Sequence, residues 1–180
     1  MTARTSRHTT GGHTTQQSAP LAQPRMIPVG TAVMNVVVRV AGIIPARLDL
    51  THVGTPEQQL GLSLGTVLVY LRSGLTARAV AEGWGRAAVL ARPLSPAIAG
   101  RRPLVVGPST VAVLAQLAGL PTVDAAFEPA RAGGAVPALL RVQVGPVTWE
   151  LCDANAYTSL LRAWRQAARL LGDNPADEDD

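Results

Sequence analysis

The chain has 180 residues, a formal net charge of +4 at pH 7 and one cysteine. A chain of this length is the size of one domain and can bury most of its apolar side chains. A single cysteine excludes an internal disulfide, and because every basic residue is arginine, a GxxxxGK[ST] phosphate-binding loop is excluded as well.

The two ends differ in composition from the centre. Residues 1–25 are rich in Thr, Gly, Gln and Pro and predict a disordered polar tail, while residues 26–172 are expected to form a single domain. Residues 173–180 hold five of the 12 acidic residues and predict a second disordered tail. This asymmetry is typical either of an anionic partner with which the tail competes or of a solvated tail that aids solubility.

The first half of the domain predicts two strands and a helix. Residues 31–40 ("TAVMNVVVRV") and 46–53 ("ARLDLTHV") are rich in β-branched and alternating residues, which favour strands. Thr55 followed by Gln58 is the pattern of a helix capping box, so a helix is expected from about residue 56 to 72.

The next segments predict two more helices. Residues 76–92 carry apolar residues at helical spacing with Trp84 as the core anchor. Residues 104–107 ("LVVG") favour a short strand, and residues 108–119 favour a helix. The segment 103–123 is uncharged and long enough for a membrane span, but two prolines divide it and polar residues dilute it, so no span is expected.

Residues 139–152 predict an antiparallel hairpin. With Gly145 and Pro146 as the turn, Val144 faces Val147, Val142 faces Trp149 and Leu140 faces Leu151, which gives one apolar face. Arg141 then faces Glu150 on the other, mostly polar face. This arrangement fits a sheet that buries a single face.

A helix is expected directly after the hairpin and up to Gly172. Asp153 is placed to cap its amino end, and Tyr157, Leu161 and Trp164 belong to its apolar stripe. Cys152 beside this cap is interpreted as a small strand-end residue. The alternative is a reactive thiol, for which a Cys152, His52, Asp153 triad is the one conventional arrangement available.

The predicted fold class is α+β: a small, mainly antiparallel sheet with a C-terminal β-hairpin at about 139–152, covered on one face by three to four helices. The core is expected to include Val36, Val38, Leu68, Trp84, Leu114, Val142, Trp149, Leu160, Leu161 and Trp164. One cysteine, one histidine outside the tail and no spaced pair of carboxylates do not make a metal site, and no cofactor motif is present.

Three functions remain open. The first is a non-catalytic cytoplasmic interaction or accessory protein, acting on a protein partner or by self-association, of a bacterium whose high-GC genome explains arginine in place of lysine. The second is a nucleic-acid-binding regulator that uses an arginine ridge on the last helix, Arg162, Arg165 and Arg169, together with Arg101 and Arg102. The third is a thiol-dependent enzyme.

Overall fold

The predicted hairpin forms the centre of one sheet. The computed structural model describes residues 35–98, 111–130 and 137–172. Strands β7 (Leu139–Val144) and β8 (Val147–Leu151) pair antiparallel with Val142 opposite Trp149, which is the register expected from the alternation of apolar residues. Gly145 has a φ of 53° at the turn, a backbone conformation that glycine adopts without a steric penalty.

Two further strands complete this sheet, which we call the hairpin sheet. Strand β1 (Val36–Val40) runs parallel to β8, and β6 (Val123–Glu128) runs antiparallel to β7. The strand order is β1-β8-β7-β6. The sheet therefore contains one parallel and two antiparallel pairs.

A second sheet has the order β2-β3-β4-β5. It comprises β2 (Ala46–Thr51), β3 (Gln59–Leu64), β4 (Val67–Leu71) and β5 (Val113–Leu117), with β4 and β5 parallel and the other pairs antiparallel. The α+β class is confirmed. The single, mainly antiparallel sheet is corrected to two mixed sheets, because each meander of three strands gains a parallel strand at its edge.

The helix predicted over residues 56–72 is wrong, because this segment forms β3 and β4. Thr55 and Gln58 do not cap a helix. The Thr55 hydroxyl donates to the carbonyl of His52 at 2.8 Å, and the Gln58 side chain accepts from the amide of Gly54 at 2.9 Å. These contacts stabilise the tight connection from β2 to β3. Hydroxyl and amide side chains form hydrogen bonds with nearby backbone groups in turns as well as at helix ends, so the same residue pattern fits both.

The helix predicted over residues 108–119 is also wrong where the structure describes it, because residues 113–117 form strand β5. The strand predicted at residues 104–107 and both predicted tails lie outside the described residues. Leu68 and Leu114 pair in the register of β4 and β5 on the outer side of the second sheet, so they do not belong to the core; Leu114 is 61% exposed.

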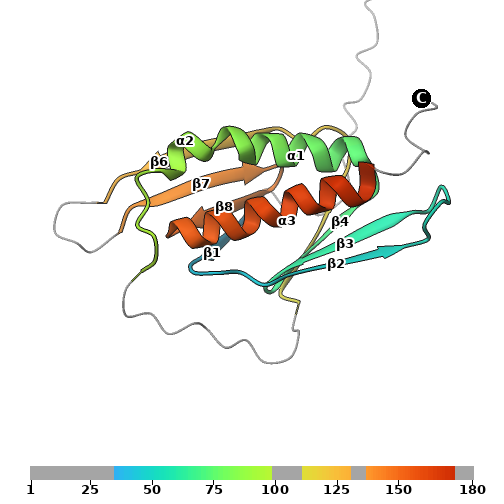
Figure 1. Ribbon diagram of the computed structural model, residues 1–180, viewed down its shortest axis with the longest axis horizontal. Coiled ribbons are helices and arrows are strands. Elements are labelled where there is room, and N and C mark those ends of the chain that lie inside the picture. Colours follow the sequence, from blue (N-terminus) through green and yellow to red (C-terminus); the bar gives the residue numbers. More distant parts are fainter. Residues whose placement is uncertain (1–34, 99–110, 131–136, 173–180) are drawn as a thin grey trace, which may run out of the picture. The chain divides into compact units, whose positions relative to one another are not determined.

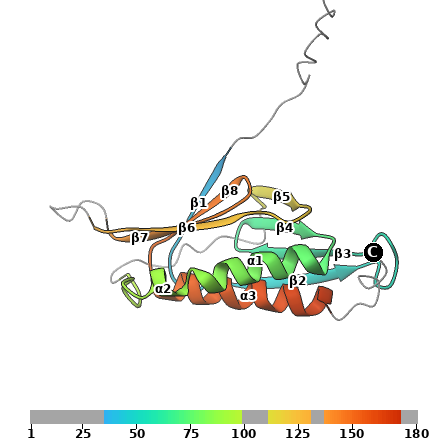
Figure 2. The same cartoon turned by 90° about the horizontal axis from the view of Figure 1, so that it is seen from above.

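Two long helices cover one side of both sheets. Helix α1 (Gly74–Arg86) continues after one residue into the short α2 (Ala88–Ala91), and α3 (Ala154–Gly172) follows β8. Figure 1 shows α1 and α3 side by side and antiparallel, and Figure 2 shows both on the same side of β6, β7 and β8. Each helix contacts strands of both sheets, so the helix pair joins the two sheets through one core.

The core is centred on three tryptophans. Trp84 contacts Trp149 edge to face at a centroid distance of 6.4 Å and stacks on Tyr157 at 6.1 Å. The predicted core residues that are buried are Trp84, Val142, Trp149, Leu160 and Trp164. The partly buried ones are Val36, Val38 and Leu161, of which Val38 and Leu161 pack against the core.

The chain contains a structural repeat that the sequence-based predictions missed. Four strands and a helix (β1–β4, α1) are followed by four strands of the same lengths and a helix (β5–β8, α3). From β3 and β7 onward the repeats align with a constant shift of 80 positions, which pairs Gly65 with Gly145 and Trp84 with Trp164. The two sheets and two helices are therefore two copies of one supersecondary unit.

The repeats exchange their first strands. Strand β1 pairs with β8 of the second repeat, and β5 pairs with β4 of the first repeat. Equivalent hydrogen bonds fix both exchanged strands: the amide of Val36 donates to Pro146 at 2.8 Å, and the amide of Val113 donates to Thr66 at 3.3 Å. Because each half completes the sheet of the other, the two repeats form one compact unit.

Candidate functional site

The exposed side of α3 carries the predicted arginine ridge. Asp153 begins the helix by accepting from the amide of Ala156 at 2.8 Å, as predicted from the sequence. The spacing of Arg162, Arg165 and Arg169 then places all three on the side opposite the buried Trp164, and all three are exposed.

Helix α1 adds two arginines that the sequence-based prediction missed. Arg78 and Arg86 are exposed on α1, which packs along α3. The signal for them in the sequence is the repeat, because it places α1 and α3 in equivalent positions. We call Arg78, Arg86, Arg162, Arg165 and Arg169 together the arginine face.

Two of these arginines reach across the junction between the helices. A guanidinium nitrogen (Nη2) of Arg78 lies 3.4 Å from where a β-carbon on Gly172 would stand, and Nη2 of Arg165 lies 3.8 Å from the same point on Gly85. Each of these arginines therefore approaches the opposite helix within ordinary van der Waals distance. Because α1 and α3 are antiparallel, the crossing arginines lie at different positions along the junction.

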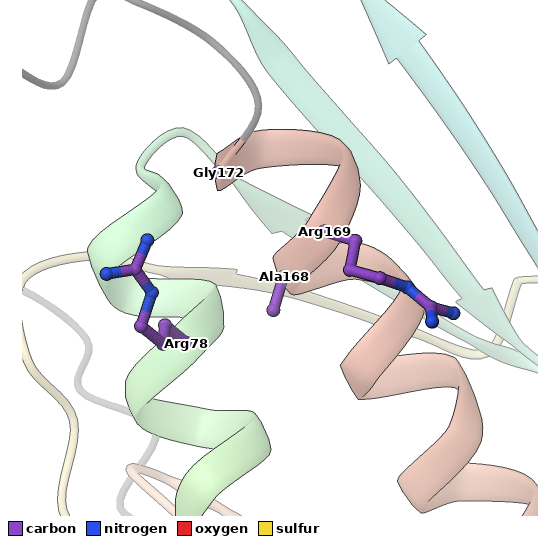
Figure 3. Close-up of a pocket in the computed structure, with 4 residues that line it drawn as sticks. All are labelled: Arg78, Ala168, Arg169 and Gly172. Carbon is purple, nitrogen blue, oxygen red and sulfur yellow. The ribbon is translucent and has the colours of Figure 1, made fainter.

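A depression of about 250 Å³ marks one end of this junction, where Arg78, Ala168, Arg169 and Gly172 line it. Figure 3 shows the guanidinium groups of Arg78 and Arg169 pointing away from each other, with Ala168 between them. Two diverging cations do not converge on one small anion. The geometry suits an extended anionic ligand that passes over several guanidinium groups.

The charge of the arginine face is not compensated within the described part of the chain. Glu82 is the one acidic residue exposed on α1 or α3, and the salt bridges among the described residues all lie on the hairpin sheet instead. The field of Arg165 reaches Tyr157, where it opposes the burial that raises the pKa of the phenol. A surface of this kind attracts anions over a distance of about 10 Å at 0.1 M salt.

Apolar side chains lie among these charges. On α1, Leu75 is 55% exposed and Val89, just beyond its end in α2, is 61% exposed. With Arg78, Glu82 and Arg86 they follow helical spacing along the solvent side of the helix. The surface therefore combines cations with large apolar groups, as partner-binding helices do.

The outer face of the hairpin sheet holds a second group of charges, which is fully paired. Glu150 accepts from Arg39 at 2.6 Å and 2.8 Å and from Arg141 at 3.0 Å and 3.1 Å, and Arg141 also contacts Glu128. These contacts cross all four strands. Hydrogen bonds from Arg39 and Arg141 hold the pKa of Glu150 below its usual value. Because each charge has a partner, this ladder stabilises the sheet and offers little to a ligand.

The remaining predicted site residues do not assemble. Cys152 is buried, and its amide donates to Val40 at 3.0 Å. His52 belongs to the connection after β2, which lies beyond the carboxyl end of α3, whereas Cys152 directly precedes the amino end of α3 (Figure 1). The structure thus does not bring the triad residues together. Arg101 and Arg102 lie outside the described residues.

Across residues 35–98, 111–130 and 137–172, no group of three or more His, Cys, Asp or Glu side chains is arranged to hold a metal ion. In the same ranges, no helix has the length and apolar character needed to cross a membrane. No protein-family model, curated protein or solved structure matches the chain.

Proposed function

We propose that this protein is a non-catalytic interaction protein of the bacterial cytoplasm that binds an acidic segment of a partner protein through its arginine face. The observation that carries the proposal is the group of five exposed arginines on two antiparallel helices, which have no acidic partner among the described residues. Charges left unpaired on one surface favour a complementary anionic surface and speed the association with it.

The choice of a protein partner rests on the apolar side chains in the same surface. Leu75, before Arg78 on α1, and Val89, after Arg86 in α2, are both more than half exposed. A protein segment that alternates acidic and apolar residues satisfies both kinds of group at once. A phosphate backbone satisfies the arginines alone, and the apolar groups would remain against water or sugar.

Nucleic acid is the second candidate, because the arginine face is also suited to phosphates. Arginine binds phosphate oxygens through two parallel N–H groups, and all five arginines are exposed. In that case the affinity would fall steeply with salt and depend little on apolar residues. The two candidates therefore differ in a measurable way.

The test compares two labelled probes on the purified full-length protein. One is a peptide of seven Glu-Glu-Leu repeats, and the other is a 20-nucleotide single-stranded DNA of mixed sequence. Fluorescence anisotropy at 50 and 200 mM NaCl gives the Kd of each. We expect the peptide to bind more tightly than the DNA at both salt concentrations, and tighter DNA binding would favour the second candidate.

A matched pair of variants localises the binding. Arg162→Gln with Arg169→Gln removes two charges from the arginine face, and Arg47→Gln with Arg72→Gln removes two exposed charges from the second sheet. The first pair should raise the Kd of the peptide about 10-fold, which corresponds to about 1.4 kcal/mol, and the second pair should leave it within about 2-fold. Equal losses in both pairs would contradict the proposal.

A further inference from the structure

We propose that residues 173–180 of the same chain bind the arginine face and compete there with the acidic partner. This inference rests on the proposed function and adds a regulatory element to it. The segment contains Asp173, Asp177, Glu178, Asp179 and Asp180 and no basic residue. It is thus an intramolecular version of the acidic ligand that the arginine face fits.

The segment begins at the arginine face itself. Gly172 is the last residue of α3 and lines the same depression as Arg78 and Arg169 (Figure 3). A nitrogen of Arg78 lies 3.4 Å from the position that a β-carbon on Gly172 would occupy. Asp173 is covalently joined to Gly172, so the acidic segment starts beside two guanidinium groups that have no acidic partner among the described residues.

The length of the segment is sufficient for the whole α3 part of the surface. Eight residues span at most about 28 Å when extended. Arg162 precedes Gly172 by ten positions on a helix that rises about 1.5 Å per residue, which places it about 15 Å away. The acidic segment is therefore long enough to extend back along the helix to Arg169, Arg165 and Arg162.

Charge and tethering both favour this contact over an external ligand. The segment has five acidic residues, and the surface of α1 and α3 has five exposed arginines and one exposed acidic residue, Glu82. A segment attached by so short a connection has an effective concentration of the order of millimolar. An external acidic segment must therefore displace it, and the exposed position of the arginines makes this competition weaken as salt screens both interactions.

The first test neutralises part of the segment without shortening the chain. The variant Asp177→Asn, Glu178→Gln, Asp179→Asn is compared with the native protein for binding of the Glu-Glu-Leu peptide. We expect the Kd to fall about 5-fold at 50 mM NaCl and less than about 2-fold at 500 mM. The control variant removes the same number of negative charges from exposed positions elsewhere, Asp49→Asn, Glu57→Gln, Asp124→Asn, and should change the Kd by less than about 2-fold.

A second measurement needs no partner. NMR signals of the arginine Nε–Hε groups are recorded for the native and the tail-neutralised protein at 50 mM NaCl. Signals of Arg78, Arg165 and Arg169 should differ between the two proteins, while that of Arg47 on β2 should not. The three differences should disappear at 500 mM NaCl, because salt screens the contact.

The two measurements separate this inference from the proposed function. Shifted arginine signals without any binding of the peptide would support the intramolecular contact and refute the proposed function. Peptide binding that neither changes with neutralisation nor accompanies shifted signals would overturn the intramolecular contact and leave the proposed function standing. An equal effect of the control variant would also overturn it, because general charge would then explain the change.

Discussion

The charge ladder on the hairpin sheet makes Glu150 a sensitive point for the stability of the protein. Its carboxylate is 5% exposed and accepts four N–H groups, two from Arg39 and two from Arg141. Glu150→Gln keeps the shape of the side chain but removes the charge, and it turns an N–H group toward one of the guanidinium groups. Each carboxylate oxygen accepts two of the four charge-assisted hydrogen bonds, so the amide replaces the acceptor of two of them with a donor.

The expected loss in free energy of unfolding is about 2 kcal/mol. Hydrogen bonds to charged groups contribute about 1.5–3 kcal/mol when a partner is removed. The loss stays below the ~3–5 kcal/mol seen for fully buried ion pairs, because the side chains of Arg39 and Arg141 are 60% and 46% exposed and turn to water. Urea unfolding at pH 7 measures the difference. Glu128→Gln is the control; its side chain is 40% exposed, so it should cost no more than about 1 kcal/mol.

The pH dependence provides a second check of the same reasoning. Arg39 and Arg141 lower the pKa of Glu150 in the folded protein, so the folded state favours the ionised form. The resulting stability is present above the unfolded pKa of about 4.3 and is lost as the pH falls through the lower folded pKa. The gap between the native protein and Glu150→Gln should therefore be constant near neutral pH and shrink below about pH 4. A gap under about 0.5 kcal/mol at pH 7, or one that stays constant into acid, would refute this account.

Three further predictions concern the helices. Gly83→Ala should destabilise by about 1–3 kcal/mol, since its β-carbon would lie 2.3 Å from a valine side chain of β6, whereas Gly85→Ala should stabilise by about 0.5–1 kcal/mol. Asp153→Ala removes two amide partners and should cost about 2–3 kcal/mol, against about 1 kcal/mol for the single cap bond of Ser73→Ala. Tyr157→Phe should cost about 0.5–1.5 kcal/mol, because the hydroxyl donates to the carbonyl of Trp84 at 2.6 Å.

Denaturant unfolding of each variant checks the three magnitudes. Equal effects at Gly83 and Gly85 would mean that the close approach of α1 to β6 is not maintained. If Asp153→Ala lost no more free energy of unfolding than Ser73→Ala, the carboxylate of Asp153 would not hold the second amide, that of Gly42. Because burial raises the pKa of Tyr157, the associated stability is present below about pH 10 and is lost above it, and the phenylalanine variant should lack this alkaline loss.

Local sequence patterns predict the structure correctly where the contacts that determine it lie within one short segment. The β7–β8 register and the α3 helix follow from apolar alternation, a glycine turn and a capping aspartate, all within 34 residues, 139–172. The buried tryptophans of α1 and α3 follow from helical spacing. The capping-box pattern of Thr55 and Gln58 predicts a helix over residues 56–72, whereas the alternation of Leu60, Leu62 and Leu64, which face the core from β3, indicates the strand that forms.

The amino-acid sequence by itself determined the hairpin, the last helix and the exposure of the three arginines on that helix, because residues close in the chain decide turns, caps and amphipathic faces. Only the tertiary structure decided that β1 and β5 change places between the repeats and that Arg78 and Arg86 join Arg162, Arg165 and Arg169 in one surface. Which strands pair and which helices pack together depends on burial of apolar side chains across the whole domain. Contacts between residues far apart in the sequence, including those that form the arginine face, therefore follow from tertiary packing.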